Sequence, residues 1–463
     1  MKGRLLTRTP VLALAVVVCS GLLVGALAAE DSPLQLVSRN DAGQLRSVAL
    51  NGLDLNNPFF QDLGTNGRRC STCHLPDQAW TITPEGVQER FAETRGLDPI
   101  FRTNDGSNCE GVGGSTPAQR RNAYSLLLSR GLIRIGIDVP ATAEFAIVAV
   151  DDPYHCGAPL TQASMYRRPL PSTNVTFLSA VMWDGRESPA GTLVIDNLKQ
   201  QSNDATLGHA QGQPISDSFR QQIVDFELGL FTAQVRDNRA ESLHAQGATG
   251  GQMALSHQPF FIGINDPVGF DPAGFNPEAF TIFSAWSSIT GHSDVEDARR
   301  SIARGERIFN TKTFTISGVA GLNDSINTPG GPVTLGDGLT TFGCTVCHDS
   351  PNAGNHSVKA PLNIGLTDAS RRTADMPLYT LRKIAGGDEV KTTDPGRAMI
   401  TGKWADIGKF KGPILRGLAG RAPYFHNGFA KSLEEVVDFY DSRFNINFTP
   451  GEKRDLVAFL RAL

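Results

Sequence analysis

Apolar side chains recur at helical spacing in three segments of the carboxyl-terminal half of the chain. Each segment begins with a capping box, a Ser or Thr followed three residues later by a Glu: the pairs are Ser293 and Glu296, Ser432 and Glu435, and Thr449 and Glu452. The apolar positions that follow share one helical face: Val295, Ala298, Ile302 and Phe309; Leu433, Val436, Val437 and Tyr440; and Leu456, Phe459, Leu460 and Leu463. The pattern therefore predicts three amphipathic helices.

The amino-terminal half has a less regular pattern. Helices are predicted near 118–130, 198–208 and 216–231, whereas the apolar runs at 132–139 and 145–150 fit either short strands or connectors. Glycine and proline, 48 and 27 of the 463 residues, concentrate in stretches at 103–117, 247–280 and 318–343. We expect a mainly α fold with long irregular loops.

The first residues have the features of an export signal. Lys2, Arg4 and Arg8 precede an uncharged run at 11–29, which closes with the small-x-small pattern Ala26-Leu27-Ala28. We expect a signal peptide over 1–28 and a periplasmic chain, with an uncleaved membrane anchor as the alternative. The net charge of −4 and the lack of a basic patch with interleaved aromatic residues exclude nucleic acid as a partner.

Two copies of the motif Cys-x-x-Cys-His indicate a bound cofactor. They are Cys70-Ser71-Thr72-Cys73-His74 and Cys344-Thr345-Val346-Cys347-His348. This spacing is the attachment signature of c-type haem, in which the thiols form thioethers with the porphyrin and the histidine binds iron. A zinc knuckle or redox dithiol is the alternative, but zinc needs more thiols or histidines nearby. The sequence therefore predicts two covalently bound haem c groups, with His74 and His348 as iron ligands.

The remaining cysteines fit the same compartment. Cys19 lies in the amino-terminal apolar run, whereas Cys109 and Cys156 lie in loop-like stretches. A disulfide between Cys109 and Cys156 suits an oxidising compartment; two unpaired thiols are the alternative.

The helices and haem motifs together suggest two haem domains. In the cytochrome c plan, terminal helices cross over a haem site that lies between them in the sequence. The helices predicted from Ser293 and Thr449 enclose the second haem motif in this way. We therefore expect an amino-terminal cytochrome c-like domain at 29–292 and a carboxyl-terminal cytochrome c domain at 293–463.

Two further stretches give the chain a family resemblance. The first runs from Arg167-Arg168-Pro169-Leu170-Pro171-Ser172-Thr173-Asn174 to Trp183-Asp184-Gly185-Arg186, and the second includes Ala422-Pro423-Tyr424-Phe425-His426-Asn427-Gly428. With the haem motifs, they resemble the bacterial dihaem cytochrome c peroxidase and MauG family, from about residue 58 to 463 with insertions in the first domain. The resemblance implies that the amino-terminal haem reacts with peroxide and the carboxyl-terminal haem accepts or stores electrons.

The resemblance also implies roles for two residues of the Trp-Asp-Gly-Arg block. Trp183 takes the position of a tryptophan that relays charge between the haems; simple core packing is the alternative. Arg186 is expected to meet a haem propionate in a charge-assisted pair, with a surface ion pair as the alternative.

The sixth ligand of the second haem departs from the usual peroxidase pattern. Peroxidases of the family carry a methionine fourteen residues after the histidine of the Tyr-Phe-His block, and counting from His426 reaches Tyr440, as in MauG-like members. Tyrosinate is a hard anionic ligand that favours ferric or higher states. We expect Tyr440 to bind the second haem iron; a core tyrosine at helical spacing is the alternative.

The residues expected on the distal side of the first haem differ further from the family pattern. The family places a glutamine and a glutamate after the Trp-Asp-Gly-Arg block. Gln201 matches the glutamine best, with Gln200 as a second candidate, and no glutamate follows. The nearest titratable group is His209, which shares a helical face with Gln201 and Ala205. We expect His209 to move the proton between the peroxide oxygens, a structural or surface role being the alternative.

This chain differs from the family pattern at two other positions. The distal histidine of some members would fall near Leu160, and His155 is out of register, which predicts a first haem that is open without prior reduction. The family commonly binds calcium between its domains through an asparagine where this chain has Arg168, so calcium is in doubt.

The resemblance implies a peroxidase that acts on hydrogen peroxide from the diferric state. A small periplasmic protein would donate the electrons, and because dimers are common among relatives, a second copy of the chain is a candidate partner. The alternatives are a MauG-like oxidase that modifies a partner protein and a dihaem electron carrier without enzymatic activity.

Overall fold

The computed structural model describes residues 34–463 apart from 269–273, 329–330, 335 and 337–338. The predicted signal peptide and Cys19 lie outside the described residues. Among the helices that are described, none is long and apolar enough to cross a membrane.

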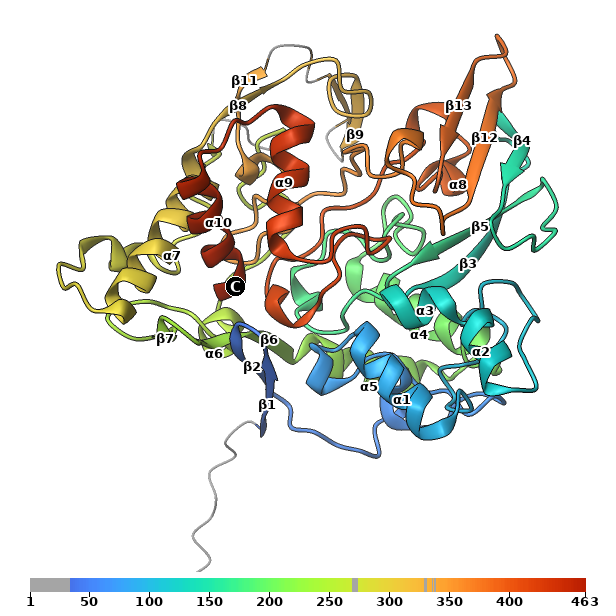
Figure 1. The fold of residues 1–463 in the computed structure, drawn as a ribbon, viewed down its shortest axis with the longest axis horizontal. Helices are drawn as coiled ribbons and strands as arrows, with labels where there is room; N and C mark the ends of the chain where they lie inside the picture. Colours follow the sequence, from blue (N-terminus) through green and yellow to red (C-terminus); the bar gives the residue numbers. More distant parts are fainter. Residues whose placement is uncertain (1–33, 269–273, 329–330, 335, 337–338) are drawn as a thin grey trace, which may run out of the picture.

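Three helices form the framework of the carboxyl-terminal half. They are α7 (Asp294–Thr311), α9 (Leu433–Phe444) and α10 (Pro450–Ala462), and their N-caps are the Ser and Thr residues of the capping boxes. Helices α7 and α10 pack directly on each other, and α9 lies beside α10 (Figure 1). The capping boxes therefore predicted the start of each helix correctly, since the side-chain oxygen accepts from an otherwise unpaired N–H.

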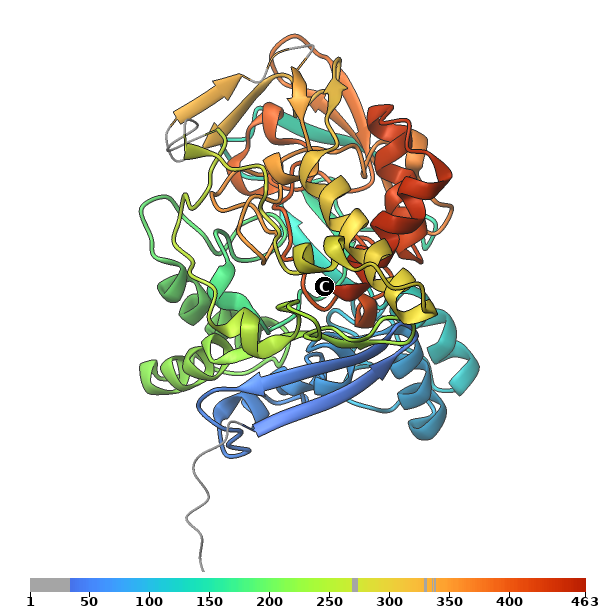
Figure 2. The ribbon, with the colours of Figure 1, turned by 90° about the vertical axis from the view of Figure 1, so that its left-hand side faces the viewer.

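The amino-terminal half combines helices with sheets. Its helices are α1 (Pro84–Thr94), α2 (Pro117–Ala123), α3 (Ser125–Arg130), α4 (Val194–Gly208), α5 (Asp217–Leu228) and α6 (Gln252–Ser256). Strands β1 (Leu34–Asn40), β2 (Gly43–Ala49), β6 (Leu230–Asp237) and β7 (Glu241–Ser242) form an antiparallel sheet in the order β1-β2-β6-β7. Figure 2 shows the β1–β2 hairpin in blue at the foot of the molecule.

The apolar runs at 132–139 and 145–150, which fitted either strands or connectors, form strands. β3 (Ile133–Asp138) pairs with β5 (Gln162–Arg167), and β4 (Phe145–Asp151) pairs with β12 (Leu378–Lys383), which also pairs with β13 (Glu389–Thr392). The remaining carboxyl-terminal elements are β8 (Phe314–Ile316), β9 (Ser325–Thr328), β10 (Gly331–Thr334), β11 (Leu339–Phe342) and α8 (Ala398–Thr401). The prediction of a mainly α fold holds only in part, because helices and several antiparallel sheets share the described chain.

The two halves of the sequence are interleaved. Strand β4 from the first half joins β12 from the second in one sheet, with Phe145 opposite Lys383 and Asp151 opposite Leu378. The main apolar core around α7 and α10 also contains Ala240, Leu243 and the segment 279–286. Residues before 293 therefore contribute to the core of the carboxyl-terminal half, and the domain boundary stays a prediction.

The expected disulfide is present. Cys109 and Cys156 are joined, with their Cα atoms 5.2 Å apart. The bond closes a loop of the first half that contains α2, α3, β3 and β4.

Candidate functional site

The first Cys-x-x-Cys-His motif lies on the wall of a cavity of about 1530 Å³. A short 3-10 helix, Cys70–Thr72, sets the two thiols, and His74 follows directly. His74 Nδ1 donates to the Trp80 carbonyl at 3.0 Å, which leaves Nε2 available as an iron ligand. Burial lowers the pKa of His74 to about 4, so the imidazole is neutral, the form that binds metal.

The second motif repeats this arrangement in a separate cavity of about 1790 Å³. The 3-10 helix Cys344–Val346 sets its thiols, and His348 Nδ1 donates to the Gly354 carbonyl at 2.6 Å. Burial lowers the pKa of His348 to about 4. Each cavity offers two free thiols and one oriented neutral imidazole. These donor sets fit haem c.

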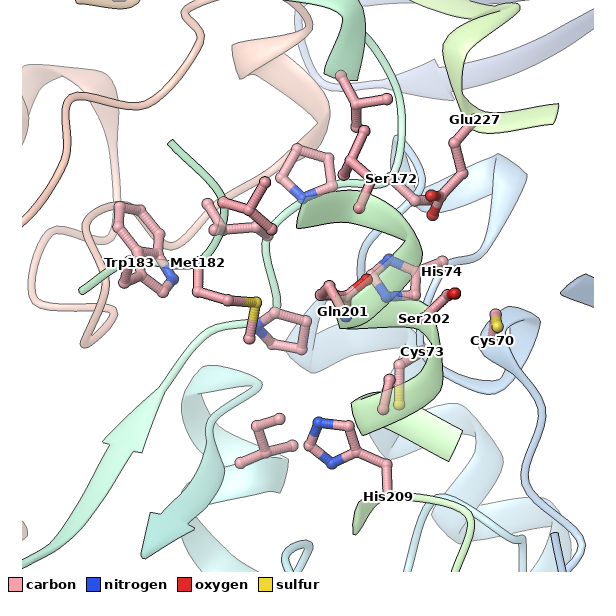
Figure 3. Close-up of a pocket in the computed structure, with 18 of the residues that line it drawn as sticks. Cys70, Cys73, His74, Ser172, Met182, Trp183, Gln201, Ser202, His209 and Glu227 are labelled. Carbon is pink, nitrogen blue, oxygen red and sulfur yellow. The ribbon is translucent and has the colours of Figure 1, made fainter. Parts of the chain in front are cut away.

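Trp183 lies on the wall that the two cavities share. Its side chain lines both of them, together with the segment 168–171 and Lys411. Figure 3 shows Trp183 at the side of the first cavity, next to Met182. The indole Nε1 donates to the Arg168 carbonyl at 2.8 Å, and the backbone N–H of Lys411 donates to the Trp183 carbonyl at 2.9 Å. The structure thus places Trp183 between the two cavities, and its relay role stays a prediction.

A buried ion-pair network holds the Trp-Asp-Gly-Arg block in place. Asp184 accepts from Arg167, whose guanidinium also pairs with Asp394 of the other half at 2.7 Å. Burial alone would raise the pKa of Asp184, but the charges of Arg167 and Arg186 lower it to about 2. Arg186 lies 3.2 Å from Asp184 and also lines the first cavity, so its guanidinium has an internal partner and a face toward the expected cofactor.

One face of α4 lines the first cavity. Gln201, Ala205 and His209 all contribute to that lining, as their spacing predicted. Gln200, the second candidate, is exposed and its amide donates to Asp204 at 2.8 Å. The structure therefore separates the two glutamines and leaves Gln201 at the cavity.

His209 belongs to an ordered polar chain. Its Nδ1 lies 2.5 Å from Asp105 Oδ2, and the other carboxylate oxygen of Asp105 pairs with the buried Arg68. Burial alone would raise the pKa of Asp105, but the hydrogen bonds and charges of His209 and Arg68 lower it overall. An ionised Asp105 fixes the imidazole so that Nδ1 carries the proton and Nε2 is the free base.

Glu227 is a residue of this cavity that the sequence analysis missed. It lies on α5, is 7% exposed, and its Oε2 makes no hydrogen bond within the described part of the chain. Burial raises its pKa to about 8, so the side chain is a neutral acid at neutral pH. Its spacing of four from Ile223, on the inward face of an amphipathic helix, was the available signal.

Tyr440 lies in the second cavity with Cys344, Cys347 and His348. Its ring packs near Phe425, Phe439 and Phe444, and burial raises the pKa of its hydroxyl. Over the described residues, this hydroxyl has no hydrogen-bond partner. The helical face predicted for α9 therefore brings Tyr440 and the second haem motif together.

The structure also locates the positions at which this chain differs from the family pattern. Leu160 is exposed and, like His155, lines a different hollow from the first haem motif. The buried guanidinium of Arg168 donates to the carbonyls of Ile82 at 2.7 Å and Arg130 at 2.6 Å. Because a cationic side chain already uses these oxygens, the surroundings of Arg168 do not fit calcium.

Comparison with known proteins agrees with the motifs. No family model matches the chain. It is 33% identical over 141 residues to cytochrome-c peroxidase IdrP2 of Denitromonas iodatirespirans, covering 27% of this chain and 38% of that protein. It is 33% identical over 141 residues to cytochrome-c peroxidase IdrP1 of Pseudomonas sp. (strain SCT), covering 26% and 36%. With cytochrome c551 peroxidase of Nitrosomonas europaea, the identity is 31% over 122 residues, covering 26% and 30%.

The chain thus spans little more than a third of the length of these curated relatives. Among solved structures, this chain aligns with the crystal structure of a MauG-like protein associated with microbial copper homeostasis. The alignment covers 88% of this chain and 86% of that protein's chain. The two chains share 16% identity with a TM-score of 0.40, a likeness too distant to support an argument on function.

Proposed function

We propose that this chain, a relative of the bacterial dihaem cytochrome c peroxidase and MauG family, is a periplasmic dihaem peroxidase. It reduces hydrogen peroxide at the amino-terminal haem site, and the carboxyl-terminal site shares the oxidising equivalents. The observation that carries this proposal is the polar face of α4, where Gln201 and His209 line the cavity of His74.

The chain's own residues supply the proton chemistry. Haem c, when attached, supplies the iron that exchanges electrons with peroxide. Asp105 holds the Nδ1 proton of His209, so Nε2 can take the proton from one peroxide oxygen and deliver it to the other, which leaves as water. The Gln201 amide orients the peroxide by hydrogen bonding. In total, hydrogen peroxide takes up two electrons and two protons and gives two waters, the electrons coming from a small periplasmic donor protein.

Replacing His209 tests this assignment. In His209→Gln, we expect the bimolecular rate of the diferric holoprotein with peroxide, measured by stopped-flow absorbance, to fall by about 10²–10⁴-fold. Gln201→Leu should show a smaller fall, and Gln200→Leu is the matched control because Gln200 faces solvent. A His209→Gln variant with full haem content and an unchanged rate would contradict the role of His209.

The second candidate function is oxidation of a partner protein, as in MauG-like members. The observation that favours it is Tyr440 in the second cavity, since a hard anionic ligand stabilises oxidised iron. The two functions differ in how long the peroxide-treated protein stays oxidised without a donor. A lifetime of minutes or more favours a protein substrate, and rapid return with a small reduced cytochrome favours the peroxidase.

A further inference from the structure

A second group of side chains that can bind metal lies behind the second haem motif, and one member, His356, also lines the second cavity. Asp266, Asp349 and His356 place one ligand atom each within 4.8 Å of one another. The three residues are 0%, 0% and 3% exposed. They come from two segments, the loop around Asp266 and the loop that follows the second haem motif.

The contact between His356 and Asp349 has an unusual geometry. His356 Nδ1 lies 2.8 Å from Asp349 Oδ2, within ion-pair distance, but in the described part of the chain neither atom has a hydrogen bond of good geometry. The pair His209 and Asp105, in the same molecule, does form a hydrogen bond at 2.5 Å. An imidazole nitrogen and a carboxylate oxygen at this separation can both bind one metal ion, since these are ligand atoms that zinc takes.

The charges in this cluster also call for a cation. Asp349 is paired with His356, and no Lys or Arg lies within ion-pair distance of it in the part of the chain that the structure describes. A buried carboxylate whose ion-pair partner is a single imidazole is costly unless further positive charge compensates it. A haem propionate would add negative charge to this cluster rather than remove it.

The surrounding loops are ordered and rich in unsatisfied oxygen atoms. Ser357 N–H donates to Asp349 Oδ1 at 2.6 Å, Gly263 N–H donates to the Ser357 carbonyl at 3.2 Å, and Asn265 Nδ2 donates to the Asp349 carbonyl at 3.0 Å. The same loop carries buried side-chain oxygens that have no hydrogen-bond partner among the described residues: Ser350 Oγ, Asn355 Oδ1 and Ser357 Oγ. Hydrogen bonds between the loop at 263–266 and the loop that follows the second haem motif therefore hold the cluster in place.

We infer that Asp266, Asp349 and His356 bind one divalent first-row transition cation of the Zn²⁺ or Mn²⁺ type. The imidazole nitrogen disfavours Ca²⁺ and Mg²⁺, which prefer oxygen ligands alone. Since Asp349 follows His348 directly and Asp266 lies on another loop, the cation ties the segment behind the second haem to the loop at 263–266. This site is distinct from the position of Arg168 and from the two haem irons.

Metal analysis of the untagged diferric holoprotein tests the site. After dialysis against a chelator and resupply with Zn²⁺ or Mn²⁺, mass spectrometry should find one such ion per chain besides the haem iron. In Asp266→Asn and His356→Gln, this content should fall by about tenfold or more, whereas His257→Gln, an exposed histidine, should keep it. Haem content by pyridine haemochrome shows whether each variant is folded and loaded.

A measurement on the wild type makes the outcome independent of variant folding. Anomalous diffraction at the Zn or Mn edge should place a peak among the three side chains. The inference is overturned if the resupplied wild type holds no third metal, if the peak lies elsewhere, or if both variants keep the full metal content.

Discussion

At the residue scale, the hydroxyl of Tyr440 is the expected sixth ligand of the second haem. It lies in the cavity of His348, and burial raises its pKa, so the protein alone holds a neutral phenol. A metal ion bound to the oxygen reverses this preference, because its charge stabilises the tyrosinate. The structure therefore supplies an apolar site in which ionisation of Tyr440 depends on iron.

Replacing this hydroxyl should change the second haem. In Tyr440→Phe, we expect the low-spin ferric signal of the second haem to convert to high spin and its reduction potential to rise, measured by electron paramagnetic resonance and potentiometric titration. Tyr424→Phe is the matched control, since Tyr424 lines the same cavity but donates to the Leu418 carbonyl at 3.1 Å. Unchanged spin state in Tyr440→Phe would show that this tyrosine is a core residue.

Glu227 gives a pH dependence with a definite sign. Burial raises its pKa from 4.5 to about 8, so between these values the folded chain holds a proton that the unfolded chain has released. The free energy of unfolding therefore falls as pH rises through this window, by up to about 1.4 kcal/mol per pH unit. Glu227→Gln should remove this slope and be more stable than wild type at alkaline pH. Denaturation midpoints between about pH 5 and about pH 9 check this, and equal slopes would contradict it.

At the scale of elements, the contact between α7 and α10 depends on Gly305. A Cβ atom there would meet the backbone oxygen of Asp455 and the Cβ of Phe459. We expect Gly305→Ala to destabilise the holoprotein by about 1–3 kcal/mol, seen as a lower thermal midpoint. Gly208→Ala, at the end of α4 with nothing within 4 Å of the added atom, is the control. Equal midpoints for the two variants would show that the helices can separate at no cost.

The elements that the sequence predicted best are those specified by local chemistry. Capping boxes located the starts of α7 and α10 because the cap is formed within four residues. The helix predicted to run to residue 231 ends at Leu228, and Leu230–Asp237 is a strand. The pairing of this strand with β2, almost two hundred residues away, overrides the local pattern. Sheets between distant strands have no local signal.

In the candidate site, too, the sequence predicts relations within one helix but not contacts made by the tertiary fold. Motif spacing predicted Gln201 and His209 on one face of α4, because that relation is internal to one helix. Asp105, which orients His209, and Glu227 on α5 were missed, since the tertiary fold brings them to the cavity from other parts of the chain. The cluster of Asp266, Asp349 and His356 likewise depends on two loops that only the fold joins.

At the scale of the whole molecule, Trp183 lies on the wall between the two cavities. In Trp183→Phe, we expect the first haem to react with peroxide as before, while the spectral change of the second haem slows by roughly tenfold or more. Stopped-flow absorbance at wavelengths specific to each haem measures this. Trp404→Phe is the control, because Trp404 is equally half-buried but lines neither cavity. Simultaneous changes at both haems in Trp183→Phe would exclude a relay.

The central claim is that an open first haem site and a Tyr440-ligated second site react with peroxide from the diferric state. Electron paramagnetic resonance of the diferric holoprotein, before and after one equivalent of hydrogen peroxide, tests it most directly. We expect one high-spin and one low-spin ferric signal, both of which disappear with peroxide. Two low-spin signals that peroxide leaves unchanged would contradict it.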